Sequence, residues 1–374
     1  MNEDNIFLMK NNIKEYDWGG ISFIPNLLGD KIDGRPKAEM WLGAHKTFSS
    51  KILYRNEYVL LSDFLEDHKE LLGCSNGEFP FLFKVLSASK PLSIQIHPSK
   101  DFALKGFESE NNKGIDINDP KRTYKDKNPK IELIYALSDF YALKGFLPLD
   151  EIKKICETLE LNFDFQSHIG FVKTIFELQT HELEKIIEKI LKNLNLIDNF
   201  RGYWFNEIYN IYGIDVGLLV FLGMNILKLK PGEVFYTNSQ EVHAYLKGDC
   251  IELMTNSDNV IRAGLTTKYI DKEEMLRVGQ FEEGNLSFLS PDFQNSFNVF
   301  RLPNTNLKLI EKKINESICI NRNSPMVLLV LDGCVSINKS LNLNKGESIF
   351  IGKKAKNLFI NGDGQAFIAG FDQD

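Results

Sequence analysis

The sequence predicts a mainly β protein built from two jelly-roll barrels with an α-helical insertion. Short apolar runs broken by Gly, Pro, Asn and Asp fill residues 1–147 and return from residue 214 to the end, which is typical of β structure. Residues 148–213 instead carry apolar side chains at helical spacing. An internal echo links residues 227–237 with 341–351, which share apolar alternation and a Gly-Glu turn. The echo predicts two related barrels of paired short strands.

Helices are expected at three places along the chain. Residues 61–72 are an exception within the first β segment, and residues 271–278 are expected to form a short helix. The insertion opens after Pro148 with Asp150 as the expected N-cap, and its later apolar residues keep a period of 3.6. We therefore divide the chain into residues 1–147 and 214–275 as the two parts of one barrel, 148–213 as the helical insertion and 276–374 as the second barrel.

Composition narrows the class of protein. A chain of 374 residues with 43% hydrophobic and 25% charged residues is an ordinary globular protein, and its net charge of −7 argues against nucleic acid as a partner. No run approaches the roughly 20 apolar residues that span a bilayer, and the acidic N-terminus is unlike a signal peptide. The five cysteines are scattered without C-x-x-C spacing. These features predict a cytoplasmic protein without a membrane partner, and we expect a monomer.

The most informative stretch runs from Pro91 to Pro98. Its apolar and polar residues alternate with period two, so in a strand Ser93, Gln95 and His97 lie on one face. An amide oxygen and an imidazole side by side can hold a metal ion, whereas the simpler interpretation is a strand with a polar, solvated face.

Two further segments supply more ligands. An Asn-Pro turn precedes Lys130 and Glu132, which share a face at the start of an apolar strand, and a carboxylate there is costly unless paired or metal-bound. His243 and Tyr245 share a face in a later strand. Gln95, His97, Glu132 and His243 together would suit zinc, although spacing alone does not bring them together.

These segments carry a resemblance to a known family, the type I phosphomannose isomerases of the cupin class. The string Ser257-Asp-Asn-Val-Ile-Arg-Ala-Gly-Leu-Thr266 is the most specific part. The other matching blocks are Tyr16-Asp-Trp-Gly-Gly20, Ala38-Glu-Met-Trp-Leu-Gly-Ala-His45, Phe83-Lys-Val-Leu86, Ser93-Ile-Gln-Ile-His-Pro98, the segment from Tyr124 to Glu132, and the segment from Pro231 to Asp249. The resemblance implies two cupin-like barrels and one Zn²⁺ per chain held by Gln95, His97, Glu132 and His243.

The resemblance also implies an activity. A family member would interconvert mannose 6-phosphate and fructose 6-phosphate through a cis-enediolate, so that a phosphosugar is the expected small-molecule partner. One departure matters, because the family often reads Asn-His-Lys-Pro-Glu where this chain has Asn128-Pro-Lys-Ile-Glu132. No role of that family histidine can apply here.

Catalytic roles are assigned to Arg262, Glu252 and Lys130. Arg262 lies in the most specific string, and its guanidinium offers a fixed fork to phosphate or enediolate. Glu252 alternates with inward-facing residues and is the first choice for proton transfer, with a structural ion pair to Arg262 as the alternative. Lys130 should point toward the metal. The residues expected to contact substrate are Ser93, Lys268, Tyr245 and Asp17.

The second barrel is expected to carry no metal. When the two echo segments are superimposed, Asn357 falls where the first copy has His243, and residues 269–374 contain no histidine. Two rival functions remain open from sequence. One is a non-catalytic cupin-like sugar-binding protein, and the other is a metal oxygenase on the same barrel, which usually uses iron with open positions on a two-histidine, one-carboxylate face.

Overall fold

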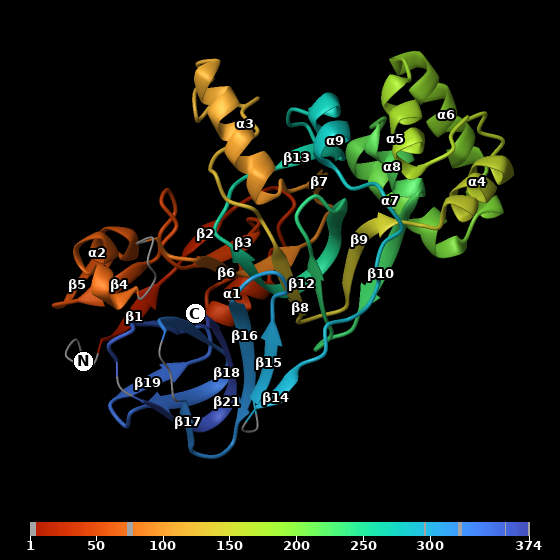
Figure 1. The fold of residues 1–374 in the computed structure, drawn as a ribbon. Coiled ribbons are helices and arrows are strands. Elements are labelled where there is room, and N and C mark those ends of the chain that lie inside the picture. The colour runs from red at the N-terminus through yellow and green to blue at the C-terminus, as the bar shows by residue number, and fades with distance from the viewer. Residues whose placement is uncertain (1–4, 73–77, 295–296, 321–323, 356, 373–374) are drawn as a thin grey trace.

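The structure is a computed structural model that describes residues 5–72, 78–294, 297–320, 324–355 and 357–372 (Figure 1). Cys74 lies outside these residues. Two large antiparallel sheets dominate the fold, so the predicted mainly β class is confirmed. The helices of residues 149–222 gather at one side of the molecule, and those of residues 100–112 and 272–278 lie above the sheets (Figure 1).

We call the first of these sheets, which has ten strands, the site sheet. Its central path runs β10-β9-β12-β6-β3-β2, and β7, β8, β11 and β13 branch from it. The ten strands are β2 (Asn12–Lys14), β3 (Glu39–Leu42), β6 (Phe81–Ala88), β7 (Ile94–Ile96), β8 (Glu132–Ala136), β9 (Phe140–Phe146), β10 (Met224–Leu229), β11 (Val234–Thr237), β12 (His243–Thr255) and β13 (Ile261–Gly264).

We call the other sheet, which has eleven strands, the C-terminal sheet. Its main path is β14-β15-β16-β21-β18-β20-β1-β4-β5, so three strands from the N-terminal part of the chain extend it. The strands are β1 (Ile6–Lys10), β4 (Lys51–Tyr54), β5 (Glu57–Leu60), β14 (Asp292–Gln294), β15 (Phe297–Arg301), β16 (Leu307–Ile314), β17 (Ile318–Ile320), β18 (Met326–Ile337), β19 (Leu341–Asn344), β20 (Ser348–Ile351) and β21 (Leu358–Phe371). The domain boundaries drawn from the sequence did not include this exchange of strands, and they stay predictions.

The helices fall largely where helical spacing predicts them. Outside the insertion they are α1 (Phe23–Leu28), α2 (Leu61–Asp67), the 3₁₀ turn η2 (Lys69–Leu71), α3 (Lys100–Asn112) and α9 (Lys272–Val278). Between β9 and β10 they are α4 (Leu149–Thr158), α5 (His168–Glu177), α6 (Thr180–Lys192), η3 (Leu194–Leu196), α7 (Asn199–Tyr212) and α8 (Gly217–Leu222).

Three details of the helices differ from the sequence expectations. The helix expected over residues 61–72 ends at Asp67, and a 3₁₀ turn, η2, follows it. The helix α4 begins at Leu149, so Asp150 lies in the first turn rather than at the N-cap. Its negative charge there interacts favourably with the positive end of the helix dipole. The helices α1 and α3 were not predicted.

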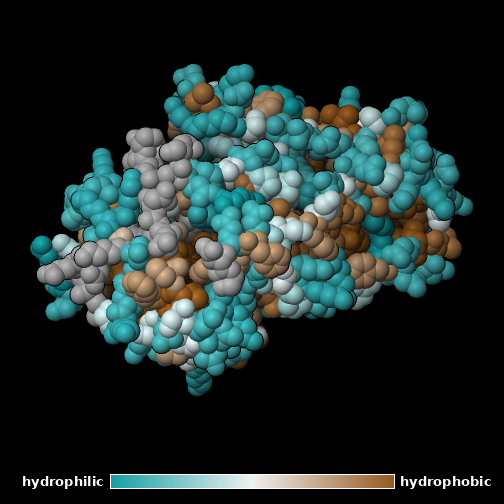
Figure 2. All heavy atoms as spheres, turned by 60° about the horizontal axis from the view of Figure 1, so that its bottom comes forward, coloured by the Kyte–Doolittle hydropathy of each residue, from teal (hydrophilic) through white to brown (hydrophobic). Residues whose placement is uncertain are grey.

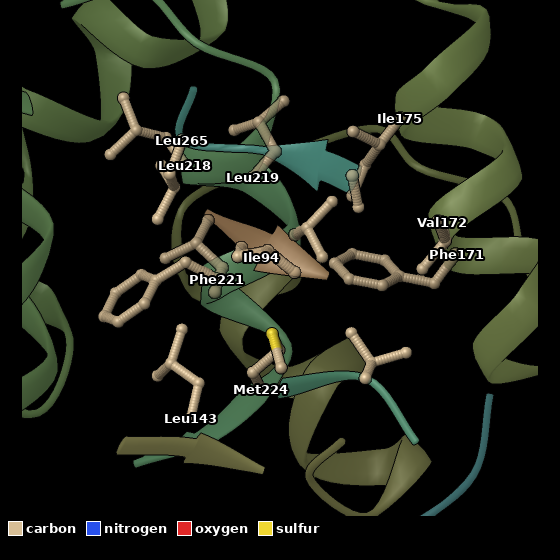
Figure 3. Packing of buried hydrophobic residues seen from close by; sticks show 14 of the residues in the cluster. Ile94, Leu143, Phe171, Val172, Ile175, Leu218, Leu219, Phe221, Met224 and Leu265 are labelled. Atoms are coloured by element: carbon tan, nitrogen blue, oxygen red, sulfur yellow. The ribbon is translucent and has the colours of Figure 1, made fainter. Parts of the chain in front are cut away.

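A single apolar cluster joins the helical insertion to the outer face of the site sheet (Figure 3). Ile94 and Leu143 of the sheet pack with Phe171 and Val172 of α5 and Leu219 of α8. Because Ile94 and Ile96 face this cluster, period two turns Gln95 to the opposite face. The helices therefore fix the strand that carries the predicted metal-binding residues.

The surface is mostly hydrophilic, as Figure 2 shows for one face, with apolar side chains exposed in separate patches. On α7 these include Phe200, Tyr203 and Ile211. Within the described residues, no helix combines the length and the apolar character needed to cross a membrane.

Candidate metal centre

Three strands of the site sheet deliver polar side chains to one place. His243 and Glu132 are the first residues of β12 and β8, and His97 directly follows β7. In the antiparallel ladder Gln95 lies opposite His243 on one side and opposite Arg262 of β13 on the other. Since paired residues in a ladder point to the same face, these side chains share one face of the sheet.

His97, Glu132 and His243 form a cluster that could hold a metal ion. One ligand atom from each residue lies within 4.8 Å of the others. The Nε2 atom of His97 is 3.2 Å from Glu132 Oε1, and that of His243 is 3.5 Å from Glu132 Oε2. All three side chains are buried, at no more than 1% exposed. The site is thus dry enough that unpaired polar atoms there are costly.

The protonation of both imidazoles follows from their second nitrogens. His97 Nδ1 lies 2.7 Å from the carbonyl oxygen of Asn259, and His243 Nδ1 lies 2.8 Å from that of Glu241. A carbonyl only accepts, so each Nδ1 carries the proton and donates it. Burial lowers the pKa of the His97 imidazole to about 3 and also lowers the pKa of His243, so both rings are neutral at pH 7.

Both Nε2 atoms therefore present lone pairs to a carboxylate. Neither atom has a hydrogen-bond partner among the described residues. Burial raises the pKa of Glu132, but Lys130 and His97 outweigh it and hold that pKa well below its usual value, so the carboxylate is ionised. Two imidazole lone pairs and a carboxylate thus face one another in a buried space. This donor set fits a divalent metal ion such as zinc.

Glu132 is oriented by two further groups. Lys130 Nζ lies 2.9 Å from Oε1, and the Tyr245 hydroxyl donates to Oε2 at 2.5 Å. Burial, followed by the neighbouring Glu132, raises the pKa of Tyr245 well above its usual value, so this hydroxyl remains a donor. Tyr245 was predicted to contact substrate, and the structure gives it the carboxylate of Glu132 as a partner.

Gln95, Ser93 and Arg262 surround the cluster. The Ser93 hydroxyl donates to Gln95 Oε1 at 3.2 Å, which leaves the other lone pair of this oxygen available. Arg262 is partly buried, and burial lowers its pKa. Its guanidinium makes no hydrogen bond or ion pair with any described residue, which leaves its whole donor fork for a ligand. The fourth ligand role of Gln95 stays a prediction.

A second buried charge cluster lies on the same inner face. Lys84 of β6 is opposite Glu252 of β12, and their charged groups are 2.7 Å apart. Lys84 also lies 3.9 Å from Glu39, which accepts a hydrogen bond from Trp41 at 2.6 Å. Burial opposes the charge on Lys84, but Glu252 and Glu39 raise its pKa above the usual value. Burial raises the pKa of Glu252.

This cluster corrects one expectation and adds two residues. The alternative of an ion pair between Glu252 and Arg262 is wrong, because the partner of Glu252 is Lys84. Lys84 and Glu39 lie in sequence blocks that resemble the family, but no role was assigned to either from the sequence. The signal was a charged residue in the middle of an otherwise apolar strand, β6, in which all eight residues are buried.

The remaining predicted substrate contacts lie nearby. The Lys268 ammonium is 5.6 Å from the centre of the Tyr16 ring, and burial followed by repulsion from Arg262 lowers the pKa of Lys268. Attraction to the Asp17 carboxylate opposes this shift, because it raises the pKa of Lys268. Burial raises the pKa of Tyr16 to about 12. These side chains form a polar rim with Arg262.

Comparison with known proteins identifies the family. Residues 6–149 match the model of the phosphomannose isomerase type I catalytic domain. The mannose-6-phosphate isomerase of Shigella flexneri is 33% identical over 381 residues, which cover 95% of this chain and 97% of the relative. The chain belongs to the type I phosphomannose isomerase family. The human mannose-6-phosphate isomerase is 29% identical over 93% of both chains.

Solved structures of the family have the same fold. A zinc-bound mannose 6-phosphate isomerase superposes with a TM-score of 0.92 at 30% identity and covers 99% of this chain and all of the other. A lysine-to-alanine mutant of the phosphomannose isomerase of Salmonella typhimurium gives a TM-score of 0.91 with the same coverage. The resemblance read from the sequence blocks is therefore confirmed.

Proposed function

We propose that this protein is a zinc-dependent isomerase that interconverts mannose 6-phosphate and fructose 6-phosphate. The observation that carries the proposal is the buried cluster of two neutral imidazoles and one carboxylate, whose metal-ligating atoms lie within 4.8 Å of one another. Relatives that cover nearly the whole chain carry the name mannose-6-phosphate isomerase, and a zinc-bound structure has the same fold.

One zinc ion per chain would be held by His97, Glu132 and His243, with Gln95 as the fourth protein ligand. Zinc held by these residues would supply positive charge next to the reacting oxygens of the sugar. The hydrogen bonds at both Nδ1 atoms fix the tautomers that such ligation needs. Lys130 and Tyr245 hold the Glu132 carboxylate in place.

Arg262 and Lys268 are proposed to bind the substrate's negative charge. The Arg262 guanidinium has no partner among the described residues. Strand β7 lies between Arg262 of β13 and His243 of β12, and its Gln95 pairs with both residues. A guanidinium at that position can bind the phosphate or the developing charge on the sugar oxygens. Asp17 and Ser93 are proposed to bind sugar hydroxyls at the rim.

Glu252 is proposed to move the proton. It would take the proton from C2 of the open-chain aldose and return it to C1, while the proton of the C2 hydroxyl passes to the C1 oxygen, so that no atom or electron is gained or lost overall. Lys84 keeps the carboxylate charged, whereas burial pulls its pKa upward, and together they suit a group that must act as base and then as acid. Lys130 is the second candidate, because its side chain lies beside the metal centre, and it would have to act as the neutral amine to accept a proton.

The rival functions are disfavoured. A non-catalytic sugar-binding protein would have no need of a buried Lys84–Glu252 pair, which costs desolvation energy. The relatives' names point to an isomerase rather than to an oxygenase. We also propose a cytoplasmic monomer, for which the scattered free cysteines and the mostly hydrophilic face of Figure 2 are the support. Light scattering after gel filtration tests the monomer.

A coupled isomerase assay tests the proposed function. Purified protein is measured with mannose 6-phosphate as isolated, after removal of metal by a chelator, and after zinc is restored. We expect turnover, its loss on metal removal, and its recovery with zinc. Sugar-phosphate binding without turnover in zinc-loaded protein would point to the sugar-binding alternative, and turnover that survives complete metal removal would contradict the zinc site.

A further inference from the structure

The loop from Ser257 to Asn259 connects two segments of the candidate metal centre. It follows β12 and precedes β13, so it lies between His243 and Arg262 in the chain. Asn259 is fully buried. Its backbone carbonyl accepts the Nδ1–H of His97 at 2.7 Å and thereby fixes the tautomer of that ligand.

The side chain of Asn259 binds a second segment. Its Oδ1 accepts from the backbone N–H groups of Lys125 at 2.7 Å and Asp126 at 3.1 Å. Its Nδ2 donates to the carbonyls of Asp126 and Asn128, both at 3.0 Å, and to Asp126 Oδ1 at 3.2 Å. The amide therefore uses both acceptor positions and both donor hydrogens. It closes the turn that runs through Asn128 to Lys130 and Glu132.

The loop is anchored from two other sides. His45 Nε2 lies 3.0 Å from Asp258 Oδ2, and the backbone N–H of Asp258 donates to Asp126 Oδ2 at 2.8 Å. The Ser257 hydroxyl donates to the same oxygen at 3.1 Å. With the loop held in this way, Asn259 connects His97, through its backbone carbonyl, to the turn that precedes Glu132, through its side chain.

We propose that Asn259 is a positioning residue, which sets the separation of His97 from Lys130 and Glu132 and so tunes zinc affinity. This inference rests on the proposed zinc site. Partners that orient metal ligands typically change metal affinity by about 10- to 100-fold when they are lost. Truncation of the Asn259 side chain removes the partner of the backbone N–H groups of Lys125 and Asp126 and of the Asp126 carbonyl, which lie in a partly buried turn, and the turn must shift to satisfy them.

Asn259→Ala is the direct test, and Arg201→Met is its matched control. The buried Arg201 guanidinium donates to the carbonyls of Phe221, Leu222 and Met224 in the helical insertion, away from the cluster. Both variants lose buried contacts to backbone groups, so both should unfold at lower temperature. Zinc dissociation constants come from competition with a coloured chelator, and unfolding of the metal-free proteins is followed by circular dichroism.

We expect Asn259→Ala to raise the zinc dissociation constant about 10- to 100-fold. Arg201→Met should leave it unchanged. At limiting zinc the turnover of Asn259→Ala should fall in parallel and should return when zinc is in excess. Equal zinc affinity in the two variants would make Asn259 merely structural and overturn the inference. If Asn259→Ala does not fold, Asn259→Ser, which keeps a hydroxyl for the turn, is held to the same criterion. Wild-type protein that binds no zinc would instead refute the proposed function.

Discussion

The two copies of the internal echo form the same turn. In the site sheet, the backbone N–H of Lys230 donates to Glu233 Oε2 at 2.7 Å and Gly232 has a φ of 92°. In the C-terminal sheet, the backbone N–H of Asn344 donates to Glu347 Oε2 at 2.7 Å and Gly346 has a φ of 82°. Both glycines take the left-handed conformation that a side chain disfavours.

The copies diverge directly after the shared turns. The first copy reaches the fully buried His243, whereas the second reaches Asn357, which is exposed. The cluster inside the C-terminal sheet is aliphatic, with Leu328 and Ile349 among its members, and its buried Glu311 is hydrogen-bonded by Asn298 and Gln365. Related architecture thus contains a large aliphatic cluster in one unit and a cluster of buried, paired charges in the other. Charges that cost desolvation energy mark the functional unit.

The largest effect should come from the proton carrier. Glu252→Gln keeps the shape and can still accept from Lys84, but it cannot take up the proton. We expect turnover to fall by about 10²- to 10⁴-fold and exchange of substrate hydrogen with solvent to stop, while zinc content stays normal. Deuterium uptake from heavy water into the substrate, beside zinc content, measures both.

Glu311→Gln is the matched control for that variant, because it changes a buried carboxylate of the C-terminal sheet. Its turnover should equal that of the wild type. If the Glu252→Gln variant still exchanges substrate hydrogen with solvent at a reduced rate, Glu252 only orients Lys84. Lys130 would then become the preferred base.

A mutation that creates a cavity in the C-terminal sheet should lower stability without changing turnover. Leu328 is fully buried in β18, opposite Ile349 and Ile368. We expect Leu328→Ala to lower the free energy of unfolding by about 2–5 kcal/mol, as measured by urea denaturation. Zinc content and turnover at 25 °C should not change. A loss of zinc in the folded variant would show that the two sheets are coupled and that the comparison is too simple.

Arg262 should matter for turnover rather than for metal content. We expect Arg262→Ala to lower kcat by about 10²-fold or more, since it removes a fork aimed at developing negative charge. Arg262→Lys should recover little, because an ammonium cannot reproduce two parallel donors. Steady-state kinetics with zinc analysis decides this, and Arg301→Ala in β15 is the control. Near-normal kcat in both Arg262 variants would make the residue incidental.

The smallest effect is the pH dependence of the metal-free protein. His97 titrates near 6.5 when unfolded and at about 3 when folded. Between these values only the unfolded state binds the proton, so stability falls as the pH decreases from about 6.5, by about 1.4 kcal/mol per pH unit. His243 shifts in the same direction. Urea denaturation at pH 7, 6 and 5 measures the slope, which should be shallower in His97→Gln. Equal stability at pH 7 and 5 would contradict buried neutral imidazoles.

Local patterns in the sequence predicted much of this site. Period two placed Gln95 and His97 on one face, and it placed Lys130 with Glu132, because side-chain direction in a strand depends only on neighbouring residues. Contacts that depend on strand register were not predictable in that way. Lys84 and Glu252 are 168 positions apart, and they meet only because β6 and β12 pair in one register.

The fold shows the same division. Alternation and the Gly-Glu echo predicted two β units and an insertion of helices. The pairing of β1 with β20, which moves an N-terminal strand into the C-terminal sheet, joins residues such as Ile6 and Ile351. No pattern among neighbouring residues indicates which distant strand β1 pairs with. The role of Asn259 was hidden for the same reason, since its partners lie more than 100 positions earlier in the chain.

Zinc content of the wild type and of the double variant His97→Ala, His243→Ala is the most direct test of the account. Metal is measured by atomic absorption on gel-filtered, folded protein. The account predicts about one zinc per chain in the wild type and nearly none in the double variant, because a mixed nitrogen and oxygen site that loses both imidazoles keeps too few donors. Full zinc content in the double variant would contradict the assignment of this cluster as the metal centre.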